Sequence, residues 1–306
     1  MPELESSGPK QFEIESMQLE EEGRELAQDL QAKLNERAEE LGVDLRFNIS
    51  PPEMPEGLTE RHLEIFKQCF DGSLEAMVLP KPAELDNFSN QYAEVMYPPE
   101  DEVRQKRDAE ERNGLVAFAT PFVFYEPVEL DSDKGTWGEM LLRSMKEELG
   151  SLQQTHSGLI LVETTSKEEN RSNSDPLFSI FQEVFGDSAG RFARSYDELV
   201  SKFLPKIKEK IKEKLREEKL TIPDFEVTAI PASIANLSMT FYHPENSTHG
   251  TDEWTSTLLV DRENRYKDLD FRLLVGDPKE GGASYVCDDP SYVQQGSVRF
   301  SILFKK

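Results

Sequence analysis

Two histidines and an aspartate in one short stretch are the first residues whose chemistry could matter. The stretch reads FYHPENSTHGTDEW, residues 241–254, and contains His243, His249 and Asp252. Zinc needs at least three nitrogen, sulfur or carboxylate ligands, and one loop could supply these three. The same stretch is rich in Pro, Asn, Ser, Thr and Gly, which are residues that tight turns require. We expect a hairpin connection here, with a metal site as the alternative hypothesis.

A second set of candidate residues follows two apolar segments in the middle of the chain. Asp131 and Asp133 come after the segment at 115–125, and Glu163 and Lys167 come at the end of the segment at 158–163 and just beyond it. If these segments were adjacent parallel strands, the polar groups would face one crevice at the carboxyl ends of the strands. The carboxylates could then hold Mg²⁺ and activate water, while Lys167 could stabilise developing negative charge. This arrangement would be a metal-dependent hydrolase.

A third candidate is the stretch KFLPKIKEKIKEKLREEK, part of a helix predicted over residues 200–219. Between positions 202 and 219 it holds eight basic and four acidic residues, a local excess of four positive charges. A basic amphipathic helix can lie on an anionic membrane surface or bind an acidic partner. Its apolar positions, Val200, Leu204, Ile207, Ile211 and Leu215, recur at helical spacing and favour packing against the protein's own core.

The elements that must position these residues indicate an α+β fold. The two apolar segments, each followed by an amphipathic helix, predict a βαβ unit in a mixed sheet at about 115–186. The long helix follows, and then a series of short strand-like runs predicts a mainly antiparallel C-terminal sheet. We expect a disordered tail at 1–11, an α/β-type domain at 12–190, and a second domain of long helix plus antiparallel sheet at 191–306.

Several local patterns make sharper predictions. Leucines at helical spacing predict a helix from about residue 18. The alternation of Val43, Leu45 and Phe47 predicts a strand, and Thr59 should open a helix. A helix that begins with a capping box at Thr136 and Glu139 should end at Gly150. The run SIANLSMTFYH, residues 233–243, is expected to be a strand.

Composition limits the class of protein. The chain has 306 residues, 60 acidic against 35 basic, and a formal net charge of -25. Such a surface repels phosphate backbones, so we expect no nucleic acid partner. The two cysteines, Cys69 and Cys287, are far apart and form no thiolate metal motif. The N-terminus has no secretory signal and no segment is apolar enough to cross a membrane, so we expect a soluble, cytoplasmic protein.

These observations support three hypotheses about function. The first is a cytoplasmic, non-enzymatic binding or adaptor protein with an acidic surface and a protein partner. The second is the hydrolase that uses Asp131, Asp133, Glu163 and Lys167. The third is membrane-surface or lipid contact through residues 200–219. No cofactor is expected, although a divalent metal is compatible with the second hypothesis and with the histidine loop.

Overall fold

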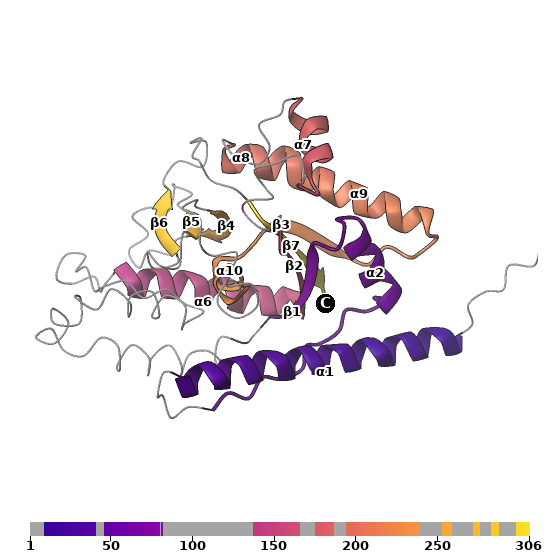
Figure 1. The fold of residues 1–306 in the computed structure, drawn as a ribbon, viewed down its shortest axis with the longest axis horizontal. Coiled ribbons are helices and arrows are strands. Elements are labelled where there is room, and N and C mark those ends of the chain that lie inside the picture. The colour runs from indigo at the N-terminus through magenta and orange to yellow at the C-terminus, as the bar shows by residue number, and fades with distance from the viewer. Residues whose placement is uncertain are drawn as a thin grey trace, which may run out of the picture.

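A computed structural model describes ten parts of the chain: residues 9–40, 46–79, 81, 137–165, 175–186, 194–238, 253–258, 272–275, 283–287 and 298–306. These parts contain helices and antiparallel strands (Figure 1), which confirms the predicted α+β class. Within them, no helix is both long enough and apolar enough to span a bilayer.

The larger sheet has four strands in the order β1-β2-β7-β3, and every pair is antiparallel. The strands are β1 (Leu74–Val78), β2 (His156–Glu163), β3 (Phe225–Ala229) and β7 (Phe300–Lys305). The strand predicted at 158–163 is therefore present. Both of its edges are taken by antiparallel neighbours, β1 and β7, so β2 offers no free edge for the parallel partner predicted at 115–125. That partner segment lies outside the described residues.

One face of this sheet carries the main hydrophobic core. Phe300, Ile302 and Phe304 alternate along β7 toward this face, where Phe66 of helix α2 (Glu60–Gln68) packs edge-on against Phe225 and Phe304. Ring centroids 5.3 and 5.5 Å apart and nearly perpendicular planes are the arrangement that aromatic quadrupoles favour. The intervening residues Ile160, Val162 and Leu303 are also buried, so β2 and β7 are covered on both faces, as a central strand requires.

Helices lie on both sides of the sheet (Figure 1). In that view α9 (Leu204–Glu217) and α7 (Phe178–Phe185) are drawn above it, while α6 (Trp137–Thr155) and the long α1 (Pro9–Glu40) are drawn below. Helix α9 contacts β3, α2 and α7, and α6 contacts β2. Helix α1 begins at Pro9, earlier than the sequence pattern predicted, and its residues Leu19, Ala27, Leu30 and Leu34 are buried.

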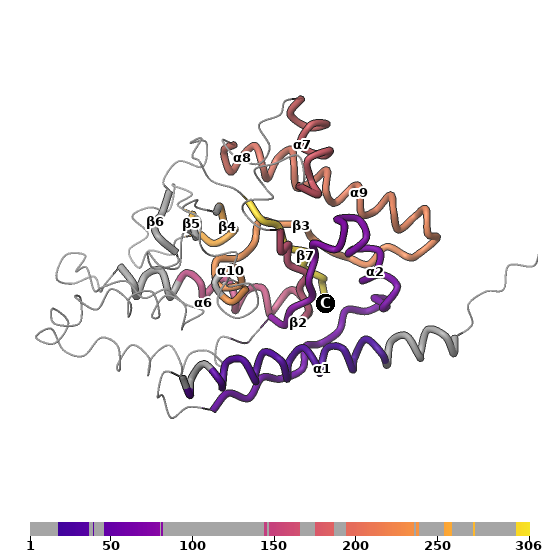
Figure 2. Tube along the Cα trace, viewed as in Figure 1, coloured from indigo at the N-terminus to yellow at the C-terminus, as the bar shows by residue number. Residues whose placement is uncertain are grey.

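The chain leaves α1 and runs back along it (Figure 2) as an extended segment without a strand partner over residues 46–50. The predicted strand is therefore wrong over these residues, although Phe47 and Ile49 do alternate inward. Two helix side chains take the place of a strand partner: Phe47 N–H donates to Asn35 Oδ1 at 2.6 Å, and Ile49 N–H donates to Gln31 Oε1 at 2.9 Å. Asn35 and Gln31 are one turn apart, so one face of α1 satisfies the backbone of the segment.

Helix α2 begins as predicted, with Thr59 as its N-cap. The Thr59 backbone N–H donates to Nδ1 of His62, and His62 Nε2 lies 2.9 Å from the carbonyl of Thr221. Because a carbonyl only accepts, Nε2 carries the proton and the ring is neutral in this arrangement. The helix ends at Gln68, and the turn that follows contains Asp71 and Gly72, whose φ angles of 51° and 81° lie in the left-handed region.

Helix α6 continues through Gly150 to Thr155, so the predicted end at Gly150 is wrong. The hydroxyl of Thr155 bonds back to the Ser151 carbonyl within the last turn, and β2 starts at the next residue. Helix α7 ends at Gly186, in the left-handed conformation with φ 70°, and its N-cap residue, Leu177, makes no side-chain capping bond. Asp175 lies in the turn before α7, where its Oδ1 accepts from Leu177 N–H at 2.8 Å.

The long basic helix contains a wider turn. It consists of α8 (Tyr196–Glu198), the π-helical segment η2 (Leu199–Phe203) and α9. The extra residue of a π-turn rotates the preceding residues, so Leu199 and Phe203 face the core and Val200, predicted inward, is 37% exposed. Pro205 follows at once; a regular α-helix would bring its ring against the Ser201 carbonyl. The predicted inward residues of α9 itself are all buried.

A second, three-stranded sheet has the order β4-β5-β6, made of β4 (Glu253–Leu258), β5 (Arg272–Val275) and β6 (Ala283–Cys287). Its antiparallel pairing matches the predicted C-terminal sheet. The strand predicted at 233–243 is wrong where the structure describes it, because Ala232–Leu237 form helix α10. Ile234, Ala235 and Leu237 are fully buried, and an apolar run covered on all sides has no period that separates helix from strand.

The strands of the larger sheet come from distant parts of the sequence. Strands β1 and β2 precede residue 190, whereas β3 and β7 follow it. The division into domains at 12–190 and 191–306 stays a prediction, and the four-stranded sheet crosses that division.

Candidate functional site

Most of the residues predicted from motifs lie outside the described residues. These are Asp131, Asp133 and Lys167 of the hydrolase hypothesis and His243, His249 and Asp252 of the metal hypothesis. Glu163 is the exception. It ends β2, is fully buried, and its Oε2 accepts from the backbone N–H of Phe300 at 3.3 Å. In this position the carboxylate supports the start of β7, which is a structural contact.

An open groove of about 500 Å³ lies between α1 and α2. Its acidic side chains come from both helices, and we call it the acidic groove. The lining residues are Gln18, Glu21, Glu22, Glu25, Glu60, Leu63, Glu64 and Lys67.

Part of the charge in the acidic groove is neutralised locally. Glu21 pairs with Arg24 at 2.7 Å, and Glu64 pairs with Arg61 at 2.8 Å. The other three glutamates, Glu22, Glu25 and Glu60, make no ion pair within 4.0 Å in the part of the chain that the structure describes. Three unpaired carboxylates therefore face one groove that contains a single lysine.

Glu22 is the groove residue whose ionisation is most perturbed. Partial burial is the main cause and raises the pKa of its carboxyl; the positive charge of Lys67 lowers the pKa, and repulsion from Glu60 and Glu25 raises it by smaller amounts. The carboxylates do not converge on a point: among the described residues, no group of three or more His, Cys, Asp or Glu side chains could hold a metal ion. The negative charge is thus spread along the groove.

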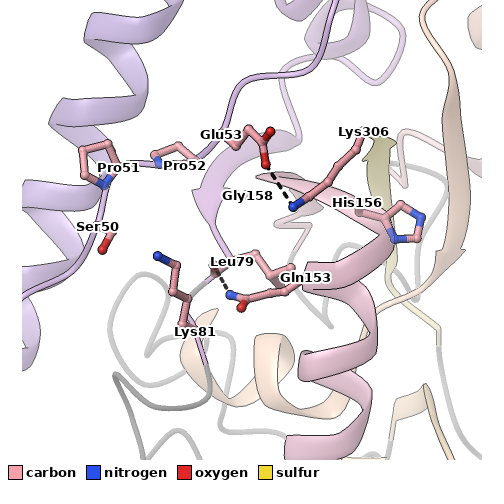
Figure 3. A pocket seen from close by; sticks show the side chains of 10 residues that line it. All are labelled: Ser50, Pro51, Pro52, Glu53, Leu79, Lys81, Gln153, His156, Gly158 and Lys306. Atoms are coloured by element: carbon pink, nitrogen blue, oxygen red, sulfur yellow. Dashed lines mark hydrogen bonds and ion pairs between the residues drawn. The ribbon is translucent and has the colours of Figure 1, made fainter.

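A smaller pocket of about 80 Å³ lies where β2, the end of β1 and the segment at 50–53 meet (Figure 3). Lys306 extends across it to Glu53, with Nζ and Oε2 2.9 Å apart, and Gln153 donates to the carbonyl of Leu79 at 3.1 Å. His156, at its edge, lies 2.8 Å from Thr155 Oγ1 through Nδ1 and 3.5 Å from Glu226 through Nε2. Lys306, Glu53 and Gln153 are thus already engaged with other groups of the protein.

A third polar feature joins α6 to the second sheet. Ser256 Oγ donates to Glu148 at 2.6 Å, and Thr257 Oγ1 also donates to this carboxylate. Thr257 Oγ1 accepts from Ala232 N–H at the start of α10, and Arg272 donates to the Ser256 carbonyl at 2.7 Å. We call this set the Glu148 network. It ties α6, α10, β4 and β5 together and is best understood as a structural junction.

The solvent side of α9 carries the basic residues predicted at 200–219. On one flank the lysines pair with glutamates: Lys202 with Glu198, Lys206 with Glu183, and Lys214 with Glu217. The apolar side of α9 is packed in the core. Insertion of that apolar side into a membrane would therefore require unpacking of the core.

Half-burial raises the pKa of the Cys69 thiol to about 11, so the thiol stays protonated at neutral pH and is a poor nucleophile.

Comparison of the chain with protein-family models, with curated proteins and with solved structures found no match.

The acidic groove has only a weak signal in the sequence. The runs LEEEGRE and TERHLEIFK each place glutamates one helical turn apart, which is ordinary for a solvated helix face. What makes the groove is the side-by-side placement of α1 and α2, and this depends on long-range packing.

Proposed function

We propose that this chain is a non-enzymatic binding protein of the adaptor type, and that its acidic groove docks a partner that carries several positive charges. The observation that carries the proposal is that Glu22, Glu25 and Glu60 line one open groove and have no cation within 4.0 Å among the residues that the structure describes. Like charges held together raise the free energy of the unbound protein, and a cationic partner would relieve that repulsion.

The spread of the carboxylates favours a polypeptide over a single ion. Because the glutamates do not converge on one point, a divalent cation could reach only one or two of them at a time. A lysine- or arginine-bearing segment can place one cation beside each carboxylate. The net charge of -25 would add long-range attraction and speed association at low ionic strength.

The test is binding of a fluorescent peptide in which lysine alternates with glycine, followed by anisotropy at low and high salt. The triple variant E22Q/E25Q/E60Q should bind this peptide about tenfold more weakly, or worse, because three charge pairs are lost. The variant should fold normally, since the pKa of Glu22 shows that its charged form is disfavoured in the native groove.

The matched control is E36Q/E147Q/E213Q, which removes three exposed carboxylates outside the groove. This control has the same net charge as the groove variant, so it measures the long-range effect alone. Equal weakening by both variants, or no binding by the unchanged protein, would show that the groove is an ordinary solvated surface.

A further inference from the structure

The second flank of α9 presents cations that make no ion pair with any described carboxylate. Lys208, Lys212 and Arg216 are spaced four residues apart and fall within about 80° of one another around the helix axis. We call these three residues the basic stripe. None of them lies within 4.0 Å of a carboxylate anywhere in the described ranges, in contrast to Lys202, Lys206 and Lys214 on the other flank.

This difference is notable in a chain with 60 acidic residues. Glutamates are available on the same helix, but Glu217 pairs with Lys214, and Glu218 pairs with Arg61 of α2. The position of the stripe is fixed by packing, because Ile207, Ile211 and Leu215 are buried and Lys208 lies over the ring of Phe225, with Nζ 5.5 Å from the ring centroid. Packing of the helix therefore fixes the backbone positions from which the three cations project.

We propose that the basic stripe binds an extended acidic segment of a partner protein, one with Asp or Glu at three alternate positions. Four residues of α-helix rise about 6 Å, so the three cations are about 6 Å apart along the axis. Two residues of an extended chain span about 6.6 Å, and side chains at alternate positions point the same way. Acidic residues at i, i+2 and i+4 of an extended segment thus have nearly the same spacing as Lys208, Lys212 and Arg216, and their side chains can all point toward the helix.

The geometry favours a single chain over a flat anionic surface. Glu209 and Glu213 lie on the solvent side of the helix next to the stripe, and both are exposed. A membrane laid against α9 would meet these carboxylates together with the cations. At physiological salt, screening over about 8 Å lets a narrow segment interact with the stripe while the remaining negative charge of the protein is largely hidden.

The experiment uses the full chain and two labelled peptides of equal composition, one with Glu and Ser alternating as ESESE and one blocked as EEESS. Anisotropy should show that the unchanged protein prefers the alternating peptide. The variant K208Q/K212Q/R216Q should lose binding by about tenfold or more. The control K202Q/K206Q/K214Q removes the same three charges from the paired flank and should bind nearly as well as the unchanged protein.

Three outcomes would overturn the proposal: equal loss in the two triple variants, equal binding of the two peptides, or tighter binding to vesicles of phosphatidylserine and phosphatidylcholine than to the peptide. Lys212→Glu, a single reversal at the centre of the stripe, repeats the test if the triple variant unfolds. The groove variant E22Q/E25Q/E60Q should retain acidic-peptide binding, so failure of the groove proposal and failure of the stripe proposal can be told apart.

Discussion

Glu148 is the residue whose ionisation is most closely tied to packing. Burial disfavours its charged form and raises the pKa of the carboxyl, while Ser256, Thr257 and Arg272 counteract this only in part. Between the ordinary carboxyl pKa of about 4.5 and the raised value, the folded protein binds a proton more tightly than the unfolded chain does. The contribution of Glu148 to the free energy of unfolding therefore falls as the pH rises through this window.

Replacement of Glu148 by glutamine should remove this pH dependence. The amide keeps the shape and can still bond to hydroxyls, which rotate to donate or accept. We expect urea unfolding between pH 4.5 and 8 to show that the free energy of unfolding of E148Q rises relative to that of the unchanged protein as the pH rises. The full difference should be about 1.4 kcal/mol for each unit by which the native pKa is raised. The exposed neighbour variant Glu147→Gln serves as the control. Parallel pH curves for E148Q and the unchanged protein would contradict the prediction.

At the scale of elements, the close approach of the segment at 50–53 to β2 depends on a glycine. A Cβ on Gly158 would lie 2.8 Å from the Cα and Cβ of Pro52 and 3.2 Å from the backbone nitrogen of Glu53. The backbone contacts are hydrogen-bonded as well, since Gly158 N–H donates to the Glu53 carbonyl at 3.2 Å. The segment and the strand can meet at this distance only without a side chain.

Gly158→Ala should therefore lower the free energy of unfolding by about 1–3 kcal/mol, because backbone has to move to make room. Gly23→Ala is the informative comparison. Its Cβ would meet only the side chains of Met54 and Pro52, each 3.0 Å away, and alanine is worth about 1 kcal/mol more than glycine within a helix. Thermal unfolding of both variants tests this ranking, and an equal or larger loss for Gly23→Ala would contradict it.

The sequence predicts elements well where a local signal decides them. Thr59 marks a helix start through capping chemistry, and the apolar run of β2 was correctly assigned to a strand. Prediction failed where residues from another part of the chain determine the local structure. Residues 46–50 alternate as a strand does, but Asn35 and Gln31 of α1 take the place of a neighbouring strand. Val200 points outward because a π-turn shifts the helix by one residue, which no periodic pattern reveals.

The candidate sites follow the same rule. The net negative charge and the basic helix at 200–219 are visible in the sequence, and the basic stripe can be drawn on a helical wheel. The sequence does not show which lysines are paired. Lys206 pairs with Glu183, and Glu218 pairs with Arg61, and both of these contacts join residues of different elements. The acidic groove requires α1 and α2 to lie together, which local patterns do not encode.

At the scale of the whole molecule, the four-stranded sheet joins the two halves of the chain. Strand β7 lies between β2 and β3 and makes hydrogen-bonded ladders with both. Its residues Phe300, Ile302 and Phe304 belong to the same core as Leu159 and Leu161 of β2. The two domains predicted on either side of residue 190 therefore share one sheet.

Separate expression of fragments 1–190 and 191–306 should show this dependence. Each fragment alone should lack a cooperative unfolding transition, because β2 would lose its neighbour β7 and β7 would lose its neighbour β2. Mixing the fragments should restore the transition and the near-ultraviolet circular dichroism of the aromatic core. Two independent transitions in the unmixed fragments would instead support the two-domain division.

The position of β7 also has a consequence for how the protein is made. A ribosome would release β1 and β2 long before β7, since their residues end at 78 and 163 while β7 starts at 300. Throughout that interval the edge of β2 that pairs with β7 in the folded protein lacks this partner. Exposed strand edges favour association with other chains. Nascent copies of this protein should therefore depend on chaperone protection until the last strand emerges, and a premature stop codon before residue 300 should yield aggregates instead of a smaller folded product.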